Sequence, residues 1–370
     1  MNIPSLVHAV ILGATLVSSI SFDEYLIEQN IKLVDNEYNF RFNLFNKELK
    51  KIKMNNQINS WKEDLNHMSI LTDNEKNNIL GWSKSVKQAS VKQVSSNLED
   101  DSYILPKSID WRDYNIISAV KDQGNCGSCW AFAAVATIES HVAIKYPGKL
   151  FDLSPQQITS CAPNPDKCGG TGGCTGATAE IAFDYLINLY KNNSSGLQSN
   201  YLNGILEEFQ YGYSSYYSGV AEKCNIPSKS IAKAQISDYI KLEENNYYEL
   251  MKAVATKGPI AISVDASTWF AYSSGIFNGC NQINPDINHA VILVGYGEEF
   301  NQKYWIVRNS WSASWGENGY IRLARFDSEQ ENCGIDNTPQ DGTACANITD
   351  PVKVCGTCGI LYDSAYPIIV

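Results

Sequence analysis

The stretch of sequence that decides the fold is Gln123-Gly124-Asn125-Cys126-Gly127-Ser128-Cys129-Trp130-Ala131-Phe132. Its glycines, Gly124 and Gly127, let the chain turn sharply. An alanine-rich run then begins at Cys129 and ends before Pro147-Gly148, which predicts a largely buried helix. The positive end of a helix dipole stabilises a thiolate at the helix N-terminus. This position would favour the thiolate form of Cys129, and an imidazolium partner would lower the pKa of the thiol further.

A thiol nucleophile needs a base beside it, and the chain has 4 histidines. His8 falls in a predicted signal segment and His67 in a predicted pro-segment. His141 lies on the same expected helix as Cys129, roughly 18 Å along it at about 1.5 Å per residue. We interpret His141 as a histidine on the helix surface. His289 is the imidazole that remains as the base.

Composition limits the function classes. The chain has 370 residues, which suits two or three domains, and 44% of them are hydrophobic. The formal net charge is -11. Binding to nucleic acid needs clustered Lys and Arg, so we expect no nucleic-acid partner. No pattern indicates a cofactor or a metal, and we expect neither.

The first residues read as a secretory signal. Residues 3–17 are apolar without Asp, Glu, Lys or Arg, and small residues follow. The run is shorter than the roughly 20 apolar residues that cross a bilayer. We predict a signal peptide at 1–21, no membrane contact after its removal, and a final place in a lysosome or vacuole or outside the cell. Glycosylation sequons at Asn192, Asn193 and Asn347 fit this route.

The segment after the signal differs from the rest of the chain. Residues 22–100 contain no Cys and no Pro, and all 11 cysteines lie after residue 120. An apolar stripe at spacings of three and four predicts an amphipathic helix, formed by Tyr38, Phe42, Phe45, Leu49 and Ile52. Residues 83–102 read as an exposed linker. We predict a propeptide at 22–104 and a mature part at 105–370.

The mature part changes character along its length. A second helix is expected at 177–190, and short β-rich runs follow at 260–264, 290–296, 304–307 and 320–323. Helices first and strands later indicate an α+β fold. We place a mostly helical half at about 114–240 and a mostly β half at about 241–370.

Three further motifs follow the opening stretch in order. They are Asn288-His289-Ala290-Val291-Ile292-Leu293-Val294-Gly295-Tyr296-Gly297, Asn309-Ser310-Trp311, and Trp315-Gly316-Glu317-Asn318-Gly319-Tyr320. With Cys-Gly-Ser-Cys-Trp, a known signature of the papain and cathepsin nucleophile, the chain resembles the papain family and is cathepsin L-like. The resemblance implies a papain-like two-domain fold, with a helical domain, a β-barrel-like domain, a cleft between them and a helical N-terminal propeptide. It implies a cysteine endopeptidase made as a zymogen.

The resemblance also implies roles for single residues. Cys129 would attack the peptide carbonyl and His289 would carry the proton. Asn309 would hold the imidazole ring, and Trp311 would cover that hydrogen bond. Gln123 would donate its side-chain amide to the oxyanion.

The resemblance implies a substrate cleft as well. Gly176 and Ala177 match a pair whose backbone binds extended substrate, and Asp363 would form the floor of the main specificity pocket. A carboxylate there would accept Arg beside Leu and Phe. The other expected cleft residues are Gly127, Thr178, Ala179, Ser263, Asn288, Ala290 and Trp311.

The partners follow from the same resemblance. We expect protein or peptide substrates, the chain's own propeptide as inhibitor, and a monomer. The propeptide helix motif is matched by Glu37, Arg41, Phe45, Ile52 and Asn56.

An odd cysteine count predicts disulfides plus one free thiol. The resemblance implies the pairs Cys126-Cys174 and Cys161-Cys224. It pairs Cys280 with either Cys358 or Cys333. Ten paired cysteines would leave Cys129 free.

Three alternatives remain open. Cys126-Gly127-Ser128-Cys129 is also a Cys-x-x-Cys motif, typical of a thiol-disulfide oxidoreductase. A catalytically inactive binding protein on the papain scaffold is the second. The third is a structural zinc site formed by Cys333, Cys345, Cys355 and Cys358.

Overall fold

The computed structural model describes residues 20–34, 36–81, 104–194, 202–342 and 344–370. Most of the predicted signal peptide and all of the predicted linker at 83–102 lie outside the described residues. Their boundaries therefore stay predictions. Ser21, at the end of the predicted signal, caps the first helix through a reciprocal pair of hydrogen bonds with Glu24.

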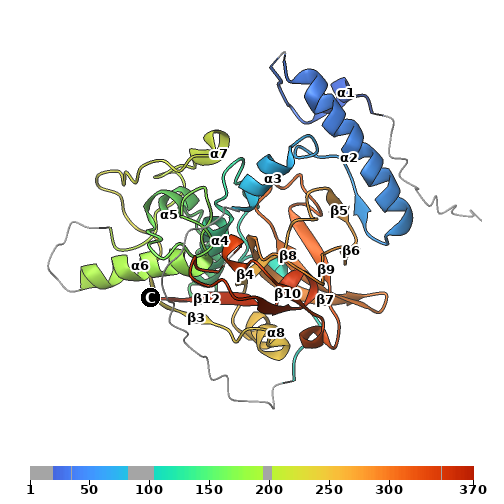
Figure 1. Cartoon of the computed structure of the whole chain (residues 1–370). Helices are drawn as coiled ribbons and strands as arrows, with labels where there is room; N and C mark the ends of the chain where they lie inside the picture. Colours follow the sequence, from blue (N-terminus) through green and yellow to red (C-terminus); the bar gives the residue numbers. More distant parts are fainter. Residues whose placement is uncertain (1–19, 35, 82–103, 195–201, 343) are drawn as a thin grey trace, which may run out of the picture.

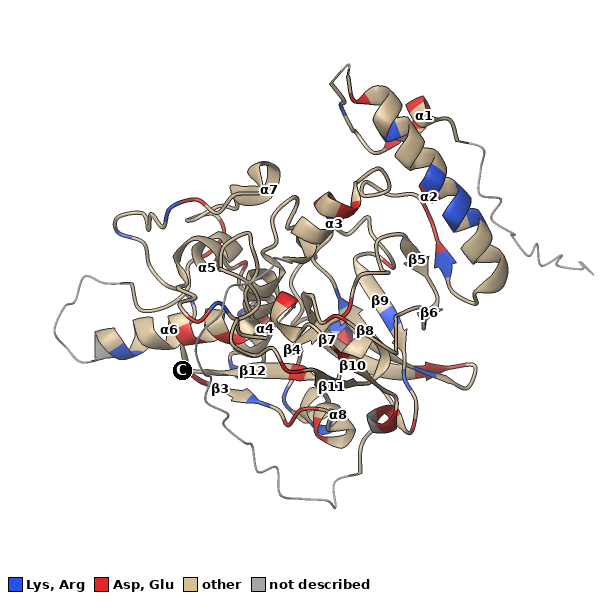
Figure 2. Ribbon diagram, in the orientation of Figure 1, with Lys and Arg blue, Asp and Glu red and all other residues tan. Residues whose placement is uncertain are grey.

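An N-terminal arm is formed by α1 (Phe22–Glu28), α2 (Tyr38–Ile58), β1 (Lys62–Glu63) and α3 (Asp73–Leu80). Figure 1 shows α1 and α2 standing away from the rest of the molecule, with α3 between them and the body. The predicted stripe on α2 packs through Phe45 against Phe22, Tyr25 and Ile70, which form a small core of their own. Figure 2 shows several Lys and Arg residues along α2.

The arm is attached to the body by strand pairing and aromatic packing. β1 pairs antiparallel with β5 (Tyr272–Ser274). The Trp61 ring lies 4.4 Å from the Phe277 ring, and its Nε1 donates to Asn278 Oδ1 at 3.1 Å. Asn66 Nδ2 donates to the Phe270 backbone oxygen at 2.7 Å. These contacts hold the arm so that the end of α3 lies against the start of α4.

The helical half is built around α4 (Cys129–Lys145), which is buried along nearly its whole length. With it lie α5 (Pro155–Cys161), α6 (Ala179–Ser194) and the short α7 (Ser215–Ser218). α4 packs against α5, α6 and the sheet. The alanines along α4 explain this, because small side chains let neighbouring elements pack closely around a helix.

The β half is an eight-stranded sheet with the strand order β3-β12-β4-β7-β8-β9-β6, to which β2 adds beside β7. The strands are β2 (Ile109–Asp110), β3 (Ile236–Lys241), β4 (Ile260–Val264), β6 (Ile276–Phe277), β7 (His289–Glu299), β8 (Gln302–Arg308), β9 (Tyr320–Ala324) and β12 (Asp363–Ile369). Successive residues of β7 face opposite cores. Val291 and Leu293 pack in one core, and Ile292 and Val294 face the core that contains α4.

A small second sheet pairs β10 (Cys333–Asp336) with β11 (Val352–Cys355). The remaining elements are α8 (Tyr247–Thr256) and the 3-10 turns η1 (Trp111–Tyr114), η2 (Glu329–Glu331), η3 (Pro339–Asp341) and η4 (Thr357–Gly359). Within the described parts of the chain, no helix has the length and apolarity needed to cross a bilayer. The expected α+β architecture, with helices on one side and strands on the other, is confirmed (Figure 1).

Candidate active site

Cys129 is the first residue of α4, as the glycine turn predicts. Gly124 adopts a φ of 58°, which glycine accepts readily. The turn is fixed on its other side by the Cys126–Cys174 disulfide and by a 3.0 Å hydrogen bond from Gly127 N to the Cys174 oxygen. The thiol sulfur of Cys129 accepts a hydrogen bond from Ala290 N at 3.5 Å. The nucleophile candidate on α4 therefore meets β7 directly beside His289.

His289 is held by the end of β8 and the loop after it. Its Nε2 lies 2.8 Å from Asn309 Oδ1, which also accepts a hydrogen bond from Ser310 N. An oxygen that accepts from both neighbours requires the Nε2 position to carry the proton. The Nδ1 atom is then the free acceptor, and it has no hydrogen-bond partner among the described residues. The ring of Trp311 lies 4.8 Å from the imidazole ring, as a residue expected to cover this hydrogen bond should.

The end of the N-terminal arm occupies the same place. Gln123 Nε2 donates to the backbone oxygen of Ile79 at 2.7 Å. The next backbone oxygen, that of Leu80, accepts from the Cys129 thiol at 3.9 Å. Two consecutive carbonyl groups of the arm thus contact Gln123, the expected oxyanion donor, and Cys129, the expected nucleophile.

Burial sets the protonation of both reactive groups in this structure. Burial raises the pKa of the Cys129 thiol to about 11, although the N–H of Ala290 opposes this shift. Burial also lowers the pKa of His289 to about 4, which the hydrogen bond to Asn309 only partly offsets. With the arm in place, the thiol and the imidazole are both neutral near pH 7.

The model of the papain family cysteine proteases matches residues 105–343 of this chain. The chain belongs to the papain family of cysteine proteases. It is 35% identical to a KDEL-tailed cysteine endopeptidase from Arabidopsis thaliana over 85% of this chain and 82% of that protein. It is 33% identical to a cathepsin L from Sarcophaga peregrina over 81% of this chain and 85% of that protein. This family member is a cysteine-type endopeptidase.

Solved precursors extend the similarity to the arm. A recombinant stem bromelain precursor superimposes with a TM-score of 0.68 at 33% identity and covers 94% of this chain and 97% of its own. The digestive procathepsin L2 proteinase of the Tenebrio molitor larval midgut gives a TM-score of 0.73 at 27% identity, with 94% and 98% coverage. The similarity supports a papain-family zymogen whose arm is the propeptide.

The cleft residues expected from the papain family surround the propeptide. A Cβ at Gly127 would come within 2.6 Å of Gly81 Cα, and a Cβ at Gly176 within 2.3 Å of the Gly81 oxygen. Gly176, Ala177, Asn288 and Ala290 line one cavity with Cys129 and His289. Thr178 and Ala179 are buried where α6 begins.

Asp363 differs from the expectation of a free carboxylate. Its Oδ1 lies 2.8 Å from Lys241 Nζ, and its Oδ2 accepts a hydrogen bond from Ser263 Oγ at 2.5 Å. Lys241 also pairs with Glu180 at 3.2 Å. Burial raises the pKa of Glu180, and the neighbouring Asp363 adds to that shift. The carboxylate expected to accept an incoming Arg is therefore not free in this structure, because a lysine from β3 already forms an ion pair with it.

His141 also differs from its predicted surface position. It is 8% exposed, and its Nε2 lies 2.8 Å from the Pro259 backbone oxygen. Burial lowers the pKa of His141 to about 4, so the ring is neutral near pH 7. Neighbouring elements cover α4 on all sides. The sequence of the helix alone does not show which elements cover His141, so its burial could not be predicted.

Five disulfides and one free cysteine, Cys129, account for all 11 cysteines. The bridges are Cys126–Cys174, Cys161–Cys224, Cys168–Cys345, Cys280–Cys358 and Cys333–Cys355. Since Cys126 is bonded to Cys174, it is not paired with Cys129 as a redox couple would be. The four cysteines of the alternative zinc site are all oxidised, which removes their thiolate ligands.

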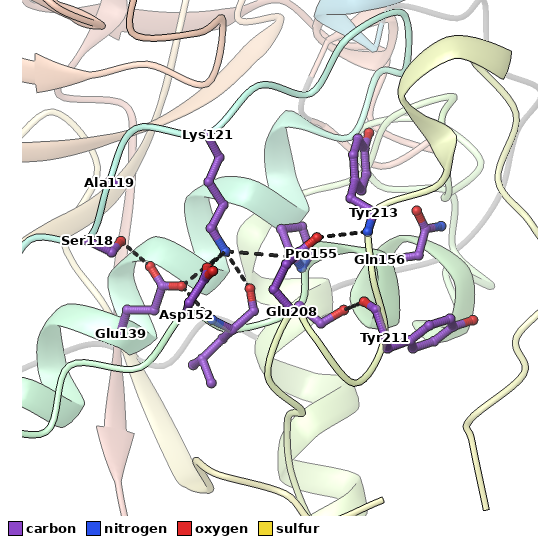
Figure 3. Close-up of polar contacts among 12 residues, drawn as sticks. Ser118, Ala119, Lys121, Glu139, Asp152, Pro155, Gln156, Glu208, Tyr211 and Tyr213 are labelled. Atoms are coloured by element: carbon purple, nitrogen blue, oxygen red, sulfur yellow. Dashed lines mark hydrogen bonds and ion pairs between the residues drawn. The ribbon is translucent and has the colours of Figure 1, made fainter.

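Sequence reasoning missed a buried ion cluster behind the site. Lys121 Nζ lies 3.3 Å from Glu139, 2.6 Å from Asp152 and 3.8 Å from Glu208 (Figure 3). Glu139 also accepts from Ser118 Oγ, to which Arg308 Nη1 donates at 3.1 Å. Lys121 precedes Gln123, Glu139 lies on the Cys129 helix, and Arg308 precedes Asn309. The cluster therefore joins three of the four segments that carry the candidate catalytic residues, those of Gln123, Cys129 and Asn309.

Proposed function

We propose that this papain-family zymogen hydrolyses peptide bonds through a Cys129–His289 thiolate–imidazolium pair once its propeptide is removed. The observation that carries the proposal is the position of the propeptide. The Ile79 oxygen binds the Gln123 amide, and the Leu80 oxygen lies against the Cys129 thiol. The inhibitory segment thus binds Gln123 and Cys129, the two residues that a substrate carbonyl group would have to contact.

The steps of the reaction follow from the geometry. Removing the propeptide exposes both reactive groups to water, and a proton passes from the thiol to His289 Nδ1. The thiolate bonds to the substrate carbonyl carbon, and His289 gives its proton to the leaving amine as the C–N bond breaks. Water, deprotonated by His289, then hydrolyses the thioester and restores the thiol.

The supporting groups act on charge and orientation. Gln123 Nε2 and the Cys129 backbone N–H would donate to the oxyanion, and losing one such donor typically costs about 10²–10³ in rate. Asn309 keeps the proton of neutral His289 on Nε2, so that Nδ1 faces the thiol.

We place the protein on the secretory route, with a signal peptide at 1–21, a propeptide at 22–104 and a mature enzyme at 105–370. Five disulfides support an oxidising compartment. The exposed sequons at Asn192 and Asn347 are compatible with glycosylation. The side chain of Asn193 lies outside the described part. We propose a lysosomal, vacuolar or extracellular monomer.

The test compares two cysteine variants after identical activation by a second protease. Cys129→Ser should lose at least about 10³-fold in kcat/KM on a peptide substrate, because a serine hydroxyl is not ionised by the same imidazole. Cys126→Ser should lose stability, about 2–4 kcal/mol, and keep activity per folded molecule. Comparable activity in Cys129→Ser would refute the proposed nucleophile.

A further inference from the structure

A loop of the β half crosses to the helical half beside the reactive groups. We call residues 337–346 the strap, and they are described except for 343. The Cys333–Cys355 disulfide closes the base of the strap between β10 and β11. The Cys168–Cys345 disulfide fixes its tip to the loop before Gly176. The strap is therefore closed by one disulfide at its base in the β half and fixed by another to the helical half at its tip.

The strap packs tightly against both halves of the molecule. On the β half, a Cβ at Gly342 would come within 2.1 Å of the Ile287 oxygen, two residues before His289. On the helical half, Gly169 N donates to the Ala344 oxygen at 3.1 Å. A Cβ at Gly169 would come within 2.7 Å of the Ala177 carbonyl carbon. The strap thus spans from the histidine side of the cleft to the Gly176–Ala177 side.

The strap also forms a wall of the reactive cavity. Asp341 and Gly342 line it together with Cys129, His289, Gly169 and Ala177. If Gly176 and Ala177 bind the residues before the scissile bond, as the proposed function requires, the strap closes the cleft on the N-terminal side of that bond. Because the strap and Cys129 line the same cavity, few residues of an extended chain, each about 3.3–3.6 Å long, fit between them.

We propose that the strap gives this endopeptidase a further activity, the release of short N-terminal fragments from peptides. The strap stops the substrate about two or three residues before the scissile bond at about 3.3–3.6 Å per residue. The bond chemistry is unchanged, since the short fragment forms the thioester on Cys129 and water releases it. Internal cleavage of a longer chain requires that chain to pass the strap, and it is therefore slower. The inference rests on the proposed function of Cys129 and His289.

The strap has little freedom to move aside. Gly342, Ala344, Cys345 and Ala346 are buried. Two disulfides restrict the conformations of the loop that they close. A loop held in this way acts as a fixed stop, whereas an untied surface loop would yield to a longer substrate.

The experiment uses the activated wild-type enzyme and a series of substrates with one to six residues before a fluorogenic amine. The two residues next to the amine stay the same. We expect kcat/KM to fall at least about tenfold, or about 1.4 kcal/mol, between three and five residues. Mass spectrometry of a long unmodified peptide should show short N-terminal fragments first. Rates that are equal at all lengths would overturn the inference.

Variants identify the strap as the cause of the limit. Cys168→Ser with Cys345→Ser unties the tip and should abolish the fall, whereas Cys333→Ser with Cys355→Ser is the matched loss of one bridge and should keep it. If the untied strap stays in place, replacing residues 338–349 with a Gly-Ser linker tests the same point. A fall that survives this replacement would overturn the inference. Absence of cleavage at every length would instead refute the proposed function.

Discussion

At the scale of single residues, one lysine changes what the Asp363 carboxylate can do. The contacts run from Cys129 through Ala290 to Ser263, which lies opposite Ala290 in the sheet. Ser263 donates a hydrogen bond to Asp363, and Lys241 Nζ lies 2.8 Å from the other carboxylate oxygen of Asp363. Burial opposes ionisation of this carboxyl, but Lys241 holds the pKa of Asp363 below its usual value. The acid at the expected pocket floor is thus present but already paired.

Lys241→Met should free this carboxylate for substrate. We expect the wild-type enzyme to prefer Leu or Phe as the second residue before the scissile bond and to reject Arg. In the variant, the ratio of kcat/KM for Arg over Leu should rise by about tenfold, because a guanidinium then pairs with the carboxylate.

Lys303→Met is the matched control, since Lys303 forms an ion pair with Asp327, whose side chain is 81% exposed. It should leave the Arg to Leu ratio unchanged. An unchanged ratio in Lys241→Met as well would mean that Asp363 does not reach the pocket.

At the scale of elements, α4 depends on a buried carboxylate as much as on its alanines. Glu139 is fully buried and accepts a hydrogen bond from Leu153 N at 2.8 Å. Glu139→Gln keeps the shape but leaves Lys121 and Arg308 with less negative charge. We expect a loss of about 3 kcal/mol in the free energy of unfolding, measured by urea denaturation of the mature enzyme.

Asp152→Asn is the control for the same lysine, because the Asp152 side chain is 69% exposed. It should cost less than about 1 kcal/mol. Equal losses in both variants would show that burial of Glu139 is not what makes it important.

Arg41 joins α2 to α3 of the propeptide through a bidentate ion pair. Arg41 donates to both carboxylate oxygens of Glu75 at 2.7 Å, and this contact lowers the pKa of Glu75 to about 2. A depressed pKa stabilises the folded propeptide above the ordinary value of 4.5, and this contribution is lost as the pH falls toward 2. The ion pair therefore keeps the propeptide folded in mild acid.

Glu75→Gln should release the propeptide at a higher pH than wild type, which a pH series of activation rates would measure. The glutamine keeps the reciprocal cap with Thr72, so the helix start is preserved. Glu37→Gln alters a more distant partner of Arg41, at 3.1 Å, and should shift activation less. An activation profile of Glu75→Gln identical to that of wild type would exclude this role.

At the scale of the whole molecule, several acids gather where the strap meets the β half. Burial raises the pKa of Asp286 to about 7, with help from Asp336, Asp265 and Asp341. A carboxyl whose pKa rises on folding is stabilised when protonated, so stability falls as the pH rises from about 4 through 7. The mature enzyme should therefore be more stable at pH 5 than at pH 8.

Asp286→Asn should flatten this dependence. We expect the Tm of wild type to fall by roughly 2–4 °C more than that of the variant between pH 5 and pH 8. Asp113→Asn, at an exposed position on η1, should keep the wild-type slope. Parallel slopes for wild type and Asp286→Asn would contradict the prediction.

The sequence by itself determined the features that depend on local pattern. The glycine turn and the alanine run placed a helix start at Cys129, where α4 begins. The strand expected at 260–264 is β4, and the four ordered motifs indicated the family. Periodicity and turn chemistry act over a few residues, so they can be read without a fold.

Only the tertiary structure decided the features that join distant segments. Cys168 and Cys345 are 177 residues apart in sequence, and Lys241 and Asp363 are 122 apart. The sequence around a cysteine does not indicate its disulfide partner. The pairing of Cys280 with Cys358 and not with Cys333 is therefore known only from the fold. The burial of His141 depends on packing around all of α4. These features arise from chain topology, which brings together side chains that no local pattern connects.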